Sequence, residues 1–177
     1  MKSPRVRPAA AEDTRILTTL ARETFVSAFA ADNDPRDLDS YVRDAFSAIR
    51  MRREIADAAN HFFLAFDAAN VAVGYAKLRA GEAESCVQGP NPIELERIYV
   101  MPTALGAGVG ALLMKASLEL AEELGHETIW LGVWEENRRA LAFYRKWSFR
   151  EVGTHTFQLG SDPQIDLVLE RPLQAAG

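Results

Sequence analysis

The sequence predicts a single α+β domain built on one twisted, mixed β-sheet of about seven strands, flanked by about four or five helices. Two observations predict this class. Some segments repeat apolar residues at helical spacing, and short runs between them are rich in valine, isoleucine and aromatic residues. No internal repeat, low-complexity tract or linker interrupts them. Because 177 residues suffice to bury an independent core, we expect one domain over residues 1–177.

The first half of the chain is expected to hold a strand, two helical regions and a hairpin. The strand covers residues 5–9, and a helix follows over residues 12–30 with apolar positions at helical spacing: Ile16, Leu20, Phe25 and Phe29. The acidic segment "DNDPRDLDSY" interrupts this pattern, and a second helical region over residues 38–59 breaks near Phe46. The runs "HFFLAFD" and "VAVGYAKLRA" predict two antiparallel strands.

The second half alternates strands with helices. After a loop over residues 81–92, we expect strands at residues 93–100, 128–134, 149–159 and 164–173, and helices at residues 108–125 and 137–147. Asn137 can cap the last of these helices. The order of elements therefore predicts a sheet with helices between several of its strands.

Composition excludes several classes of partner. The formal net charge of −5 argues against broad nucleic-acid binding, which usually needs a basic face. No apolar run reaches the ~18 residues of a membrane span, and the N-terminus lacks the apolar core of a signal peptide. We therefore expect a cytoplasmic protein without a nucleic-acid or membrane partner. No pattern specifies the oligomeric state, so a homodimer stays open.

The segment "LGAGVGALL", Leu105 to Leu113, places three glycines at every second position ahead of a helix. Each glycine costs a helix about 0.5–1 kcal/mol relative to alanine. A P-loop is excluded because no Lys-Ser/Thr pair follows. A dinucleotide fingerprint is disfavoured because residues 101–105 separate the strand from the glycines. The first amides of a helix favour an anion, so a pyrophosphate site and a bare structural turn remain.

Two segments resemble one known family. "ELERIYVMPTALGAGVGALLMKASLELA" and "TIWLGVWEENRRALAFYRKWSF" are similar to the GCN5-related N-acetyltransferases (GNAT), over about residues 93–149. That family has a Gln/Arg-x-x-Gly-x-Gly/Ala loop behind a Val-x-Pro strand end. An Asn later opens a helix that contains Ala-x-x-x-Tyr and ends near Gly-Phe. This chain departs at Leu105, where Gln or Arg is usual, and at Ser148, where Gly is usual.

The resemblance implies a GNAT-like fold that uses acetyl-CoA as co-substrate. In the family, the strand before the loop binds the pantetheine arm through its backbone, and the loop holds the pyrophosphate. The implied coenzyme-binding residues are Ile98, Tyr99, Val100, Leu105, Gly106, Ala107, Gly108, Val109, Gly110, Ala111, Asn137, Ala140, Tyr144 and Lys146. No metal is expected, because the histidines lack the spacing of metal ligands.

Acetyl transfer to an amine needs a proton donor and a proton acceptor. Tyr144 matches the family's tyrosine that protonates the coenzyme A sulfur, and its phenol is a donor at neutral pH. A tyrosine that only packs in the core stays the alternative. An alkylamine has a pKa near 10.4, so a base is required. Glu94 and Glu96 are the candidates, because strand alternation places both on one face; a solvated strand end stays the alternative.

The expected acceptor is a primary amine of a small molecule. "RETFVSAFA" and the C-terminal segment from Trp130 look like the PaiA-type polyamine acetyltransferases, which implies spermidine or spermine. Asp32, Asp34 and Asp37 are the candidate contacts, because carboxylates attract a polycation; helix caps and surface charge are the alternative. Other acceptors, such as a protein N-terminus, and a non-catalytic acetyl-CoA-binding regulator also stay open.

Overall fold

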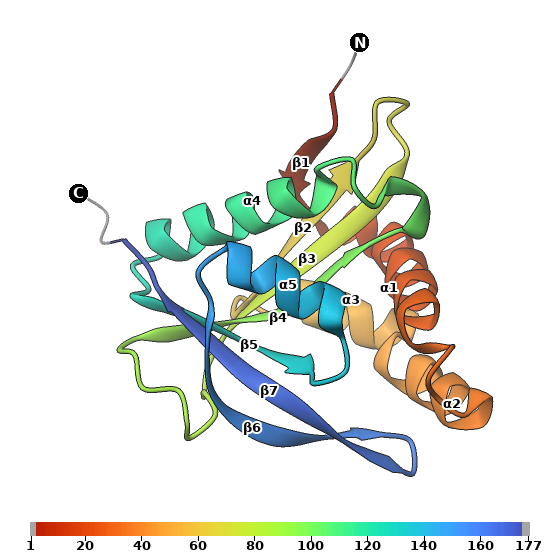
Figure 1. The fold of residues 1–177 in the computed structure, drawn as a ribbon. Coiled ribbons are helices and arrows are strands. Elements are labelled where there is room, and N and C mark those ends of the chain that lie inside the picture. The colour runs from red at the N-terminus through yellow and green to blue at the C-terminus, as the bar shows by residue number, and fades with distance from the viewer. Residues whose placement is uncertain (1–2, 175–177) are drawn as a thin grey trace.

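Within residues 3–174, which the computed structural model describes, the chain forms one seven-stranded sheet in the order β1-β2-β3-β4-β5-β7-β6 (Figure 1). The strands are β1 (Arg5–Pro8), β2 (Asn60–Phe66), β3 (Ala72–Ala80), β4 (Pro92–Val100), β5 (Thr128–Trp134), β6 (Arg150–Leu159) and β7 (Asp162–Pro172). Residues 1–2 and 175–177 of the predicted domain lie outside the described residues. The predicted mixed α+β class is confirmed.

Helices cover both faces of this sheet. The chain forms α1 (Thr14–Phe29), α2 (Pro35–Ala45), α3 (Ala48–Ala56), α4 (Val109–Glu123) and α5 (Arg138–Lys146), with short 3-10 helices at Ala11–Asp13 and Pro102–Ala104. Figure 1 shows α4 and α5 on one face and α1 to α3 on the other. Each face has its own core, since α4 and α5 share one buried cluster and α1 to α3 share a second.

Local capping explains where α2 and α3 begin and end. The Asp34 side chain accepts a hydrogen bond from the Arg36 amide at 2.8 Å, and Pro35 occupies the first helical position. α2 therefore starts three residues before the predicted Leu38. Phe46 ends α2, and Ser47 caps α3 with its hydroxyl 3.3 Å from the Arg50 amide. The predicted break near Phe46 is confirmed.

β4 and β5 are neighbours in the sheet but pair over only a short stretch. These strands are parallel and pair from Pro92 with Thr128 only as far as Glu94 with Trp130. Beyond that point β4 continues along β3 to Val100, while β5 continues along β7 to Trp134. The two strands therefore diverge and leave a gap in the middle of the sheet.

Candidate active site

A groove of about 1540 Å³ passes through the gap between β4 and β5 and reaches both faces of the sheet. The part beside α4 and α5, which we call the α4–α5 side, is lined by residues that include Gly106, Gly108, Gly110, Ala111, Asn137, Ala140 and Tyr144. The opposite part, the α1–α3 side, is lined by charged and aromatic residues that include Phe29, Tyr41, Arg50, Glu54, Lys77, Arg79, Glu94, Glu96, Arg97, Phe157 and Asp166.

Glycines shape the wall of the α4–α5 side. Gly106 and Gly108 have φ angles of 83° and 81°, a left-handed conformation that costs other residues about 1–2 kcal/mol. A Cβ atom built on either glycine meets no atom of the described residues within 4 Å, because it would project into open space. Both glycines line the groove. Their absent side chains therefore serve the turn and also keep this wall open.

The first backbone amides of α4 have no hydrogen-bond acceptor in the backbone of the described residues. The first amide of this region that bonds back into the helix is that of Leu112, to the Gly108 carbonyl at 3.1 Å. Within the described residues, the amides of Val109, Gly110 and Ala111 have no backbone acceptor. The Val109 side chain is 1% exposed and belongs to the core, so only its amide is available. These amides and the helix dipole form a site suited to an anion.

Residues 98–100 of β4 line the groove beyond the point where β5 leaves. Ile98 and Val100 pack against the cluster under α4, whereas Tyr99 packs against the cluster under α1. The backbone of these residues pairs with β3 and has no strand on its other side within the described residues. That free edge can accept an extended polar chain as an additional strand would.

α5 supplies the remaining predicted residues of this side. Asn137, Ala140, Tyr144 and Lys146 line the groove, as does Leu105 from the glycine loop, whereas Ala107 does not. The Asn137 side chain also caps α5 by accepting a hydrogen bond from the Ala140 amide at 3.1 Å. Tyr144 is 8% exposed, and burial raises the pKa of its phenol well above the ordinary value. The phenol therefore stays protonated at neutral pH and can act as a donor.

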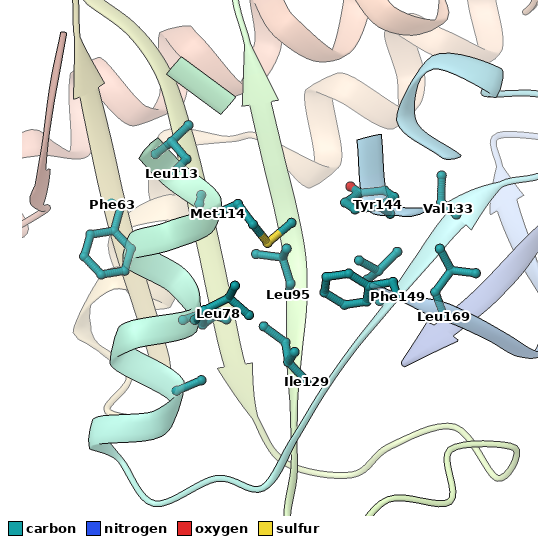
Figure 2. Close-up of a cluster of buried hydrophobic side chains, with 14 of the residues drawn as sticks. Phe63, Leu78, Leu95, Leu113, Met114, Ile129, Val133, Tyr144, Phe149 and Leu169 are labelled. Atoms are coloured by element: carbon teal, nitrogen blue, oxygen red, sulfur yellow. The ribbon is translucent and has the colours of Figure 1, made fainter. Parts of the chain in front are cut away.

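A Schellman motif fixes the end of α5 and with it Tyr144. The Ser148 amide donates to the Arg145 carbonyl at 3.0 Å, and the Phe149 amide donates to the Tyr144 carbonyl at 3.2 Å. Ser148 has a φ of 64°, which explains why glycine is usual at this position in the resembled family. The Tyr144 and Phe149 rings are in contact, with centroids 5.8 Å apart (Figure 2).

The two predicted bases lie on one face of β4 and are both engaged by cations. Glu94 accepts hydrogen bonds from Arg79 at 2.6 and 3.0 Å. Glu96 contacts Lys77 at 2.9 Å, Arg97 at 3.1 Å and Arg79 at 3.1 Å. Burial raises the pKa of Glu94, and the Arg79 charge opposes that rise. Their role as bases stays a prediction.

Glu54 lines the groove and was not predicted from the sequence. It comes from α3 and contacts Arg97 at 2.8 Å and Lys77 at 3.1 Å, and both cations are nearly buried. Burial acts to raise the pKa of Glu54, but Arg97 and Lys77 outweigh it and lower the pKa to about 2. A signal was present in the sequence, because lysine and arginine at apolar positions of β3 and β4 require buried partners.

Comparison with known proteins identifies the family. The profile of the acetyltransferase (GNAT) family matches residues 19–149. This chain belongs to that family. An uncharacterised N-acetyltransferase of Lactobacillus delbrueckii subsp. lactis is 33% identical over 154 residues, which cover 87% of this chain and 88% of the relative. The GNAT chain described here is therefore an N-acetyltransferase.

Solved structures share this fold. The PaiA N-acetyltransferase of Thermoplasma acidophilum, solved in complex with coenzyme A, superposes with a TM-score of 0.78 at 21% identity, over 96% of this chain and 99% of that one. Mutant forms of the spermidine/spermine N-acetyltransferase SpeG of Vibrio cholerae superpose with a TM-score of 0.68 at 20% identity, over 96% and 94%. At these identities the likeness shows the fold, and the predicted GNAT-like architecture is confirmed.

The groove of this GNAT enzyme is not lined, within the described residues, by the predicted acidic contacts Asp32, Asp34 and Asp37. Asp34 caps α2, and Asp37 accepts hydrogen bonds from the Ser161 amide and hydroxyl in the turn between β6 and β7. Asp34 and Asp37 thus have structural partners, whereas the Asp32 carboxylate has none within residues 3–174. Their part in acceptor binding stays a prediction.

Asp166 is a second residue that sequence reasoning missed. It lies on β7, lines the α1–α3 side and is 14% exposed. Its Oδ2 atom is 3.8 Å from His155 Nε2 on β6. Burial raises the pKa of Asp166 to about 6, and the nearby His155 opposes that rise. In the sequence it is one aspartate in an apolar strand, and only the pairing of β5, β6 and β7 brings it to the groove.

Two general properties complete this description. Across residues 3–174, no three His, Cys, Asp or Glu side chains are grouped so as to hold a metal ion. Among the described helices, none combines the length and the apolar character needed to cross a bilayer.

Proposed function

We propose that this GNAT enzyme transfers an acetyl group from acetyl-CoA to a primary amine of a small molecule, and that the amine is a polyamine such as spermidine or spermine. The observation that supports the proposal best is the groove that crosses the sheet. Its α4–α5 side offers free amides for an anion, and its α1–α3 side offers carboxylates and aromatic rings for a cation.

The α4–α5 side fits coenzyme A in shape and charge. The open wall at Gly106 and Gly108 leaves room for phosphates against the amides at the start of α4. The free edge at residues 98–100 suits the amide groups of a pantetheine arm. Lys146 and Asn137 offer further polar contacts. When bound, acetyl-CoA would supply an activated acetyl thioester, and the protonated Tyr144 would hold a proton ready for the sulfur.

The polyamine acceptor rests on charge and on a shared fold. Glu54, Asp57, Glu94, Glu96 and Asp166 contribute carboxylates to the groove, and PaiA and SpeG acetyltransferases have this fold. Of the predicted contacts Asp32, Asp34 and Asp37, the first two flank Asn33, whose side-chain oxygen accepts a hydrogen bond from the groove residue Gln164. In this proposal these aspartates attract the distal amines of the polyamine at the groove's mouth.

One observation favours a second acceptor class. Arg50 and Arg79 line the groove with side chains 55% and 49% exposed. Guanidinium groups at a groove's edge recognise carboxylates and phosphates. An amine that also bears an anionic group is therefore the second candidate.

A thiol-release assay with acetyl-CoA separates these acceptors. The panel contains spermidine, spermine, an amino acid, an amine with a phosphate group and a peptide with a free N-terminus. We expect turnover with spermidine, and a KM that rises with salt because charges on partly exposed groups are screened over about 8 Å at physiological ionic strength. Asp37→Asn should raise that KM more than it lowers kcat.

Other outcomes of this assay change the proposal. Turnover of the anionic amine alone favours the second acceptor class. If the KM for spermidine changes neither with salt nor in Asp37→Asn, the proposed electrostatic acceptor site is wrong. If acetyl-CoA binds but no amine causes release of the coenzyme A thiol, the proposed catalytic activity is wrong, and a non-catalytic acetyl-CoA-binding regulator is favoured.

A further inference from the structure

Asp166 and His155 form a pair over Gly132 of β5, where the strand has no side chain. They face each other across β6 and β7, and Asp166 also pairs with Trp134 of β5. The pair has room because residue 132 is glycine. A Cβ atom there would lie 2.9 Å from His155 Cε1 and 3.4 Å from Asp166 Oδ2. All of these residues line the groove on its α1–α3 side.

The surroundings of Asp166 are aromatic. Phe29 lies against Trp134 with ring centroids 6.2 Å apart, and Tyr41 lies against Phe157 with centroids 5.4 Å apart. These rings and the pair line the same part of the groove. An aromatic wall can hold an ammonium group through cation–π attraction while it keeps water away from the carboxylate.

Asp166 is free of strong cationic partners. Within the described residues it makes no ion pair with lysine or arginine, in contrast to Glu94 and Glu96. The titratable groups that face it are His155 from β6 and Tyr41 from α2. Because burial outweighs the opposing charge of His155, its pKa rises to about 6. A carboxylate of this kind accepts a proton more readily than one clamped by guanidinium groups.

Asp166 and Tyr144 lie on opposite faces of one stretch of β5. Consecutive strand residues point to opposite faces. At Gly132 the Asp166 carboxylate lies over the α1–α3 face, whereas Val133 packs in the same buried cluster as Tyr144 (Figure 2). A reacting group in the gap between β4 and β5 would therefore have a proton acceptor on one side and a proton donor on the other.

We infer that Asp166 accepts the proton that the acceptor ammonium must lose, and that His155 leads this proton toward Glu84 and solvent. Glu84 Oε1 lies 3.6 Å from His155 Nδ1, and the Glu84 side chain is 42% exposed. Both distances, from Asp166 to His155 and from His155 to Glu84, exceed hydrogen-bond length, so a small side-chain movement completes the path. This inference rests on the proposed function.

The proton count of the step is balanced. The ammonium gives one proton to Asp166, and the neutral nitrogen attacks the thioester carbonyl carbon to form the C–N bond. The C–S bond then breaks, and its electron pair stays on sulfur, which takes a proton from Tyr144. The second proton of the nitrogen restores the Tyr144 phenol. One proton is released to solvent through Asp166 for each acetyl group transferred.

Asp166→Asn tests the inference, with Asp162→Asn as a matched control on the same strand. The Asp162 carboxylate accepts a hydrogen bond from the Gln164 side chain, and the amide oxygen of asparagine can accept the same bond. We expect Asp166→Asn to lower kcat/KM at pH 7 by about 10²- to 10⁴-fold. Its remaining activity should rise about tenfold per pH unit as the free amine forms, up to a pKa near 10.4. Asp162→Asn should retain the wild-type profile.

A readout without turnover supports the same assignment. In protein labelled with 13C at aspartate carboxyls, one signal should titrate near pH 6 and be absent in Asp166→Asn. His155→Gln should move that titration to higher pH, because a positive imidazole favours the carboxylate. Coenzyme A affinity, measured by calorimetry, should match wild type in Asp166→Asn.

The outcomes separate this inference from the proposed function. Activity of Asp166→Asn within a few fold of wild type, or a carboxyl that titrates near pH 4, overturns the role of Asp166 alone. If Glu94→Gln abolishes the fall in kcat/KM at acidic pH while Asp166→Asn keeps the wild-type pH profile, the base is Glu94 instead. A wild-type enzyme that acetylates no amine overturns the proposed function and this inference together.

Discussion

The two sides of the groove offer different kinds of chemical group. The α4–α5 side presents backbone amides, a free strand edge and glycines that keep side chains out of the way. The α1–α3 side presents ion pairs, carboxylates and aromatic rings drawn from elements far apart in the chain. One sheet thus combines a surface defined by backbone geometry with a surface defined by side-chain charge.

This difference implies different sensitivities. A backbone site changes when a side chain is added, because the space beside the amides is then filled. A charged site changes when pH or a partner charge changes, because each ion there depends on its neighbours. Tyr144 lies at the boundary between the two sides, Glu54 lies on the charged side and Ala111 lies on the backbone side, so a variant at each position tests a different part of this comparison.

Tyr144→Phe should have the largest effect on the reaction. Removal of the phenol takes away the proton for sulfur, so kcat should fall by about 10²- to 10⁴-fold. Coenzyme A affinity should stay unchanged in calorimetry, because the backbone site is intact. Tyr99→Phe is the control, since it removes the phenol of a half-buried tyrosine from the same groove and should change kcat only a few fold. Equal losses in both variants would exclude a specific role for Tyr144.

Glu54→Gln should weaken the fold on the charged side. The change leaves Lys77 and Arg97 buried with Glu96 as their remaining partner, and we expect a loss of about 3 kcal/mol in the free energy of unfolding. The pKa of Glu54 in the folded protein, about 2, lies below the ordinary glutamate value of 4.5, so this contribution is full above pH 4.5. It is lost as the pH falls toward 2.

Urea denaturation at pH 7 and pH 3 measures this effect, and the two proteins should become more alike at the lower pH. Glu119→Gln is the control, because the Glu119 pair with Lys115 is exposed and should change stability by less than about 0.5 kcal/mol. A deficit in Glu54→Gln that does not depend on pH would contradict the assignment of the effect to the carboxylate charge.

Ala111→Glu should affect the backbone side alone. Ala111 is exposed, lines the groove and lies in the first turn of α4. A carboxylate there suits the helix dipole, so stability should be kept. Repulsion of phosphates should weaken coenzyme A binding by about tenfold, which corresponds to about 1.4 kcal/mol.

Leu112→Glu places the same charge one residue further along, on a side chain that is 36% exposed and outside the groove lining. Calorimetry should find its coenzyme A affinity close to that of wild type. If both variants bind coenzyme A equally well, the amides at the start of α4 are not the phosphate site.

The backbone side was easier to predict from sequence than the charged side. The glycines, the start of α4 and Asn137 lie in short contiguous segments, and their chemistry depends on local conformation. By contrast, Glu54 meets Arg97 across 43 positions, and Asp166 reaches the groove only through the pairing of β5, β6 and β7. Spacing rules contain no information on such distant contacts.

Element boundaries show the same limit. The break at Phe46 was predicted because the apolar pattern fails there, whereas the start of α2 at Pro35 depended on the Asp34 cap. The acidic run suggested an attraction for cations, yet Asp34 and Asp37 form hydrogen bonds with the backbone. Composition reports charge, but tertiary contacts decide which charges are free to meet a ligand.

The divergence of β4 and β5 also bears on the order of events during turnover. Under the proposed function, this gap gives the donor and the amine separate entrances on the two faces, so the amine binds while the donor is still in place. Initial-rate plots at several fixed amine concentrations should therefore intersect rather than run parallel. An unreactive coenzyme analogue should compete with the donor but not with the amine. The separation of β4 and β5 thus predicts a sequential kinetic mechanism, in which both substrates are bound before any product leaves.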